Sequence, residues 1–186
     1  MIRWILRRQI AAFERAWNYD AAYLCRHLID TDPHCAMLTF GKVRYLTKYR
    51  KDIPVAAYCA AGLIAAMAED CGPCTQLGID VAQREGVDPG VLRAVVARDY
   101  IAMPYKVALA ARFTEATLDH APWADDLRED VIHQFGQRGL TSLAFAMAAA
   151  RCFPILKYAL GHGEACTRVT VGGESQPVLL QMSKAA

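Results

Sequence analysis

The sequence predicts an all-α protein with a single domain. Apolar residues recur at helical spacing along most of the 186 residues, prolines and glycines punctuate these stretches, and alternating strand patterns occur only near the C-terminus. A chain of this length can bury one hydrophobic core. We therefore expect one helical domain over residues 1–186, with 1–50 as an N-terminal helical extension and 166–186 as a C-terminal tail or small hairpin.

Local signals divide the chain into nine expected helices. Asp32 and Asp88 each precede a proline, and an Asp N-cap followed by Pro at the first helical position starts a helix well. Pro154 falls inside an apolar pattern and should kink or split the last helix. Three glycines are expected to end helices: Gly86, Gly139 and Gly161. The expected ranges are 2–17, 19–29, 33–50, 54–70, 73–85, 89–101, 104–119, 123–137 and 139–160.

The C-terminal tail has a different pattern. Alternating residues at 167–171 and an apolar stretch at 178–180 flank Gly172-Gly173. This pattern predicts either a small hairpin or an extended arm that lies on a partner subunit.

Composition narrows the functional classes. The chain is 54% apolar and 22% charged with a net charge of +2, which argues against disorder and against a nucleic-acid partner. Basic residues near Arg3 to Arg8 and at 42–51 alternate with apolar residues at helical spacing, as on solvated helix faces. The longest apolar run, Ile53–Ala68, is shorter than the roughly 20 residues of a membrane span, so we expect a core helix and no membrane.

Cysteine usage indicates a cytoplasmic protein. The seven cysteines are odd in number and scattered, unlike the dense framework of a small secreted domain. Trp4 and two arginines interrupt the first apolar stretch, which is unlike a secretory leader. The cysteines are Cys25, Cys35, Cys59, Cys71, Cys74, Cys152 and Cys166.

The most informative motif is Cys71-Gly72-Pro73-Cys74. Two cysteines at this spacing at the start of a helix can cycle between dithiol and disulfide. Pro73 favours a turn followed by a helix, so we expect both sulfurs on one helix face and the Cα atoms about 4.4–6.8 Å apart. Cys71 and Cys74 are the candidate catalytic residues.

The local sequence activates these thiols only weakly. Backbone N–H groups at the helix start favour a thiolate by about 0.3–1 kcal/mol, which is less than one pKa unit. Glu69 and Asp70 oppose this effect, and no basic residue lies within eight positions on either side. We therefore expect only a modestly activated thiol unless another segment contributes. The candidates are His120, His133 and His162, each of which could instead be a surface or helix-capping histidine.

Metal and cofactor sites are not expected. A single Cys-x-x-Cys supplies two zinc ligands, and Cys152 and Cys166 stand too far apart in sequence to form the second pair. The glycines form neither a phosphate loop nor a dinucleotide fingerprint.

The tetrapeptide matches the active site of thioredoxins, but a long alanine-rich helix precedes it here where thioredoxins have a strand. The context resembles the alkylhydroperoxidase D-like branch of the carboxymuconolactone decarboxylase superfamily over roughly residues 40–162. The similar blocks are Val55–Ala68, Gly86–Asp88, Lys106–Ala116, Gly139–Ala146 and Lys157–Gly161. This resemblance implies an oligomeric all-helical bundle and a peroxiredoxin-like oxidoreductase.

The resemblance also implies a proton relay that this chain lacks. Peroxidases of the family have a glutamate twelve residues before the first cysteine and a histidine four residues after the second; here these positions are Cys59 and Gly78. Glycine cannot transfer a proton, so peroxidase activity should be weakened. Cys59 on its apolar helix is interpreted as a core residue, with a third redox sulfur as the alternative.

The leading hypothesis is a thiol–disulfide redox protein acting on a small hydroperoxide or disulfide, with an electron-donor protein or dithiol as reductant. The resemblance points to Cys74 as the attacking thiol, whereas the thioredoxin-like tetrapeptide points to Cys71; we favour Cys74. The alternatives are a carboxymuconolactone decarboxylase-like lyase and a non-catalytic oligomer whose cavity binds a small apolar or aromatic ligand.

Residues 140–160 also predict assembly. Their apolar side chains cannot share one helix face, and a helix that is apolar all round needs cover all round. We expect a closed homo-oligomer whose contact is drawn from this helix or from Val55–Met67.

Overall fold

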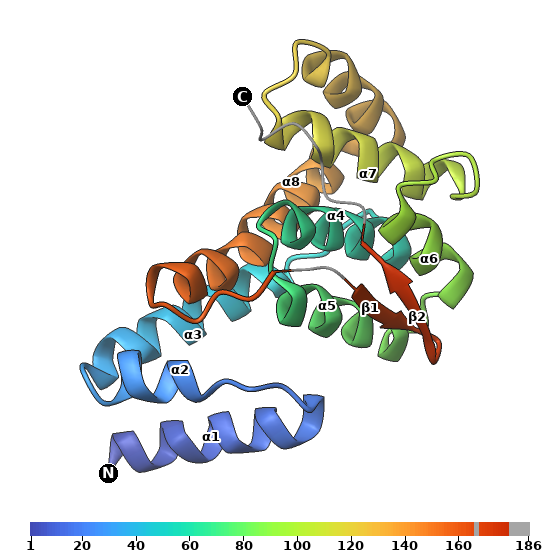
Figure 1. The fold of residues 1–186 in the computed structure, drawn as a ribbon. Helices are drawn as coiled ribbons and strands as arrows, with labels where there is room; N and C mark the ends of the chain where they lie inside the picture. Colours follow the sequence, from blue (N-terminus) through green and yellow to red (C-terminus); the bar gives the residue numbers. More distant parts are fainter. Residues whose placement is uncertain (166–167, 179–186) are drawn as a thin grey trace.

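The structure, a computed structural model, describes residues 1–165 and 168–178. It is mostly helical, with a small hairpin near the C-terminus (Figure 1). The helices are α1 (Ile2–Trp17), α2 (Ala22–Leu24), the π-helical turn η1 (Cys25–Ile29), α3 (Pro33–Lys48), α4 (Val55–Ala68), α5 (Gly72–Arg84), α6 (Pro89–Ala97), α7 (Tyr105–Leu118) and α8 (Ala124–Ala159). The strands are β1 (Arg168–Val171) and β2 (Glu174–Pro177).

Helix α4 is the centre of the fold. It contacts α5, α6, α7 and α8, and alanines on several of its faces let these helices approach closely. One apolar cluster joins α4 to α5, α6, α7 and the hairpin, and a second joins it to α7 and α8. Its own chain covers most of α4, so this helix leaves little surface for the oligomer contact that Val55–Met67 was expected to supply.

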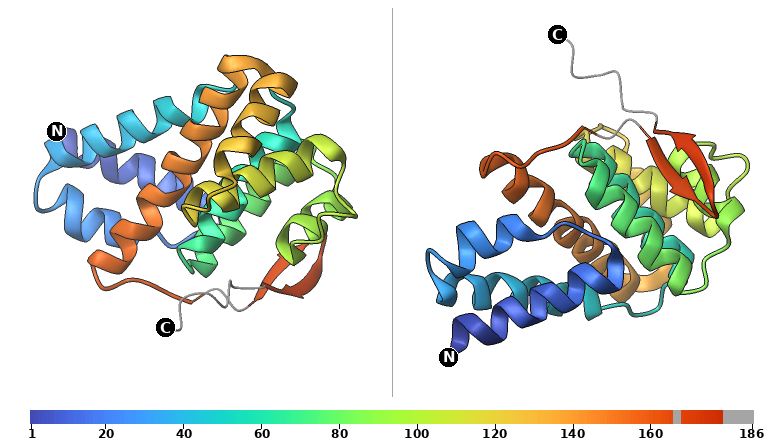
Figure 2. Two further views of the ribbon diagram at one scale, coloured as in Figure 1. Left: turned by 90° about the horizontal axis from the view of Figure 1, so that it is seen from above. Right: turned by 60° about the horizontal axis from the view of Figure 1, so that its bottom comes forward.

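The N-terminal helices α1 to α3 form a third apolar cluster with their own buried residues. Leu77 of α5 and Phe153 and Leu160 at the end of the chain's last helix pack against this cluster. Figure 2 shows α1 to α3 together on one side of the molecule and the hairpin on the other. The helix expected at 19–29 begins later, at Ala22, because Asn18 adopts a left-handed backbone that ends α1 and the following residues form a turn.

The capping signals act as predicted. The Asp32 carboxylate accepts a hydrogen bond from the backbone N–H of His34 at 2.9 Å, and Asp88 accepts one from Gly90 at 2.7 Å. These bonds satisfy N–H groups that lack a partner inside their helices.

In α8, the structure differs from the sequence-based expectations at two positions. The break expected at Gly139 lies at Gly136, which has φ 69° and ψ 176°, while Gly139 is helical and packs on Phe135. Of the kink or split predicted at Pro154, the split does not occur, because the backbone stays helical through this buried proline. Packing of α8 on α3 and α4 outweighs the single hydrogen bond that the proline removes.

By length and composition alone, α8 could cross a membrane. The core helix of a soluble protein meets the same criteria, and α8 contacts α3, α4 and α7 of its own chain.

The two strands form an antiparallel hairpin, in which Arg168 pairs with Pro177 and Val171 with Glu174. Gly172 and Gly173 form the turn with φ values of 60° and 86°, which favour glycine. Val169 and Val171 are buried in the cluster shared with α5 and α6. The tail therefore forms a hairpin, which is one of the two predicted alternatives. Cys166 and the expected strand residues beyond 178 lie outside the described residues.

Candidate redox site

Cys71 and Cys74 form a disulfide at the start of α5, with their Cα atoms 5.3 Å apart. This distance confirms the predicted range. Cys71 is the extended N-cap residue, and the helix begins at Gly72, one residue before the expected start. Pro73 fits the first turn because the missing N–H is not needed there.

Several hydrogen bonds shape this first turn. The backbone N–H and the hydroxyl of Thr75 both donate to the Cys71 carbonyl at 2.9 Å. The Gly72 N–H donates to the Glu164 carbonyl at 3.0 Å, so the segment after α8 closes over the start of α5. Asp70, just before the motif, adopts a left-handed backbone, and its carbonyl accepts a hydrogen bond from Tyr158 at 2.8 Å.

The two cysteines differ in accessibility. Cys71 has no exposed surface, whereas Cys74 is half-buried. Cys74 Sγ lies 3.8 Å from the hydroxyl of Tyr19, in the segment between α1 and α2. An incoming molecule can therefore reach Cys74 more readily than Cys71.

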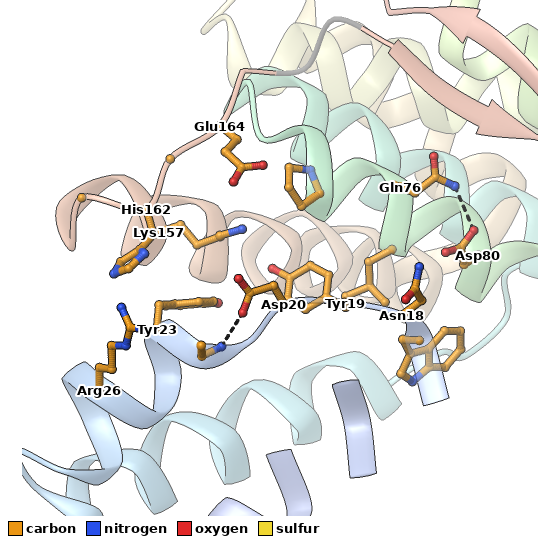
Figure 3. A pocket seen from close by; sticks show the side chains of 16 residues that line it. Asn18, Tyr19, Asp20, Tyr23, Arg26, Gln76, Asp80, Lys157, His162 and Glu164 are labelled. Carbon is orange, nitrogen blue, oxygen red and sulfur yellow. Dashed lines mark hydrogen bonds between the residues drawn. The ribbon is translucent and has the colours of Figure 1, made fainter. Parts of the chain in front are cut away.

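A cavity of about 470 Å³ lies at the start of α5 (Figure 3). Pro73, which stands between the two cysteines, lines it, whereas Cys71 and Cys74 do not. Its wall comes from three parts of the chain: α5, the segment around α2, and the end of α8 with the residues that follow. Lining residues include Pro73, Leu77, Tyr19, Tyr23, Lys157 and Glu164.

Lys157 is a buried basic residue in the wall of this cavity. It is only 4% exposed, and its Nζ lies over the rings of Tyr19 and Tyr23, 5.2 and 5.5 Å from their centroids. Within the described part of the chain it forms no ion pair at 4 Å or less. Burial lowers the pKa of Lys157, while the negative charges of Glu164 and Asp20 act in the opposite direction.

The two tyrosines beside Lys157 are held in the neutral form. Burial raises the pKa of Tyr19, and a side-chain hydrogen bond with Tyr23 partly offsets that rise. Burial also raises the pKa of Tyr23. Both hydroxyls therefore keep their protons at neutral pH and can act as donors.

Of the three candidate histidines, His162 alone lies in the wall of this cavity. Its Nε2 is 3.0 Å from Nε2 of His27, a residue that sequence reasoning did not select. His120 follows α7 and His133 lies on α8, both exposed and neither in the wall. His120 and His133 therefore follow the alternative of surface histidines.

The positive charges near the dithiol come instead from α8. Arg151 pairs with Glu69, one of the two acids expected to oppose thiolate formation. Sequence reasoning missed Arg151, Lys157 and Tyr19 because only tertiary packing brings them to α5. Lys157 could have been selected as a site candidate from the sequence, because it is a lysine inside an apolar helical stretch.

The positions of the family's relay lie at the contact between α4 and α5. A Cβ added at Gly78 would meet Leu63 Cδ2 at 2.9 Å, and Leu63 follows Cys59 by one helical turn. Cys59 packs against the core, and burial raises its pKa to about 11. These contacts favour the interpretation of Cys59 as a core residue.

Among residues 1–165 and 168–178, no group of three His, Cys, Asp or Glu side chains could hold a metal ion. The arrangement can make and break one disulfide in the first turn of α5. Pro73 in that turn lines the cavity, and the buried Lys157 lies in the cavity wall. No family model, curated protein or solved structure matches this chain.

Proposed function

We propose that this chain is a thiol–disulfide oxidoreductase of the alkylhydroperoxidase D-like type, a peroxidase or disulfide reductase that uses Cys71 and Cys74. The observation that carries the proposal is the Cys71–Cys74 disulfide at the start of α5, in which Cys74 is half-buried and faces the hydroxyl of Tyr19. Its reaction partners would be a small hydroperoxide or disulfide and a separate dithiol or electron-donor protein.

Cys74 is the attacking thiol in this proposal. The complete burial of Cys71 supports this choice, because a nucleophile must reach its substrate whereas a resolving thiol needs to reach only Cys74. Their Cα separation of 5.3 Å allows the second step without a large backbone movement.

With a hydroperoxide, the Cys74 thiolate attacks the terminal oxygen and the O–O bond breaks. The alkoxide leaves and takes a proton from water, and Cys74 becomes a sulfenic acid. The Cys71 thiol then attacks the Cys74 sulfur, forming the disulfide and releasing water. An external dithiol reduces the disulfide by exchange and is itself oxidised to a disulfide.

The helical surroundings support the family resemblance. A long apolar helix precedes the dithiol, and α7 and α8 pack on that same helix. Cys59 and Gly78 in the relay positions favour a slower peroxidase than the family's relay-bearing members.

Titration of the reduced protein with one equivalent of hydroperoxide tests the proposal. We expect Cys71 and Cys74 to become linked, with a mass loss of about 2 Da for the two hydrogens. Cys71→Ser should stop at a sulfenic acid that dimedone traps on Cys74, and Cys74→Ser should form no disulfide. Cys35→Ser, which removes an exposed free cysteine, is the matched control.

A parallel titration with a small disulfide separates the two activities. Oxidation by the disulfide alone would assign a disulfide reductase. If neither oxidant links the two cysteines, the redox proposal fails and the ligand-binding alternative gains support.

A further inference from the structure

We infer that the Tyr19 hydroxyl stabilises the thiolate of Cys74 by a hydrogen bond, and that Lys157 is a positioning residue that supplies positive charge beside it. This inference rests on the proposed function and adds to it the groups that take the place of the missing relay.

The hydroxyl of Tyr19 lies 3.8 Å from Cys74 Sγ. A disulfide sulfur carries no proton, so the hydroxyl is the donor in this contact. After reduction the same hydroxyl faces a thiolate, which is a stronger acceptor, and a hydrogen bond to the charged form lowers the pKa of a thiol.

The surroundings hold Tyr19 in this position. Its ring contacts Phe13 of α1 edge to face, with centroids 5.7 Å apart, and the residue is only 8% exposed. Its hydroxyl also interacts with that of Tyr23. A donor held by packing has less freedom to lose when the thiolate forms than a flexible side chain has.

Lys157 lies over the rings of both tyrosines. Its Nζ is within 5.5 Å of the two ring centroids, and Figure 3 shows the side chain directed toward Tyr19 and Asp20. A buried ammonium next to a phenol strengthens the phenol as a donor and favours a nearby anion. Since Lys157 forms no ion pair within the described residues, this charge is available to the site.

Other charges around the cavity act on Cys74 with both signs. Asp80 accepts a hydrogen bond from Gln76 on α5, and Arg151 pairs with Glu69. Asp70 precedes the motif. The remaining charged or titratable groups in the wall are Asp20, Arg26, His162 and Glu164. The group that faces Cys74 Sγ directly is the hydroxyl of Tyr19.

The test measures the pKa of the Cys74 thiol in a Cys71→Ser background. Alkylation by iodoacetamide is followed against pH, and mass spectrometry of the Cys74 peptide separates it from the other cysteines. We expect Tyr19→Phe to raise this pKa by about one unit, since one hydrogen bond to the charged form is lost. Lys157→Met should also raise it, whereas Lys157→Arg should preserve it.

The control is Tyr58→Phe, which removes a hydroxyl that donates to the Thr47 carbonyl far from the dithiol. In the two-cysteine protein, Tyr19→Phe should slow oxidation of the dithiol about threefold, because the thiolate fraction falls about tenfold while nucleophilicity rises with pKa. Circular dichroism checks folding, and Tyr19→Leu replaces Tyr19→Phe if the latter unfolds.

The possible results distinguish this inference from the proposed redox function. Unchanged Cys74 pKa values in Tyr19→Phe and Lys157→Met would overturn the inference, even if the dithiol still cycles. A raised pKa in a protein that neither hydroperoxide nor disulfide oxidises would support the inference while rejecting the proposed function.

Discussion

Arg138 on α8 binds Asp52 in the connection before α4 through two hydrogen bonds, from Nε to Oδ2 at 2.6 Å and from Nη2 to Oδ1 at 2.8 Å. The pair lies two residues after the break at Gly136. Nearby, the Ser142 hydroxyl accepts a hydrogen bond from the Lys51 N–H at 2.8 Å. Together these contacts join the residues before α4 to α8.

The Arg138–Asp52 pair predicts a pH-dependent loss of stability. The hydrogen bond from Arg138 lowers the pKa of Asp52 below its usual 3.8, so its stabilisation is present above that value and is lost as the pH falls through the lower folded-state pKa. Arg138→Gln should lower the Tm at pH 7 by about 1–3 °C, since both groups are exposed. The difference from wild type should shrink as the pH falls below 3.8 and disappear once Asp52 is protonated in the folded protein as well. Arg3→Gln, which removes an exposed arginine from α1, is the control; an equal effect of both variants would contradict the prediction.

Gly136→Ala should destabilise the protein by about 1–3 kcal/mol, because φ 69° with ψ 176° is a region open almost only to glycine. Space is not the cause, since no atom lies within 4 Å of the added Cβ. Gly62→Ala in α4 adds the same atom in equally open space on a helical backbone and should be neutral or stabilising. Chemical denaturation compares the two, and equal effects would argue against a backbone cause.

Gly78→His should destabilise the protein by about 1–3 kcal/mol, because its Cβ meets buried Leu63 at 2.9 Å. Leu63→Val in the same chain should recover part of this loss by removing the atom in contact. If α4 and α5 are arranged as in the family, the imidazole then lies within a turn of Cys74 and should raise peroxide turnover. An unchanged turnover and an unchanged Cys74 pKa in the folded double variant would count against that arrangement.

Cys59 should resist alkylation in the native protein. With its pKa raised by burial to about 11, only about 0.1% of the thiol is ionised at pH 8. Exposed Cys35 should react at least about a hundredfold faster, and denaturant should bring the two rates together. Rapid labelling of native Cys59 would reopen the alternative of a third redox sulfur.

We propose that α8 supplies the contact of a homo-oligomer. Ile155 and Tyr158 are 49% and 45% exposed on this helix, and Ala148 is exposed on the turns before them. Ile155→Glu should shift the sedimentation coefficient at tens of micromolar toward that of a monomer, because a buried unpaired carboxylate is costly. A wild-type protein that already sediments as a monomer would overturn the proposal.

The sequence predicted most of the secondary structure because its signals are local. Asp32 and Asp88 with their prolines start α3 and α6 where expected, and Gly172-Gly173 forms the turn of the hairpin. The split predicted as one alternative at Pro154 does not occur, because contacts of α8 with other helices decide whether one lost hydrogen bond breaks a helix.

By itself, the sequence determined the helical class and the proximity of Cys71 and Cys74, since a spacing of three residues at a helix start brings two side chains together whatever surrounds them. The tertiary structure alone decided that Cys74 is the accessible sulfur and that Tyr19 and Lys157 lie beside it. Those residues come from segments far from α5 in the chain. Their approach depends on how the N-terminal helices and the end of α8 pack, which no local pattern encodes.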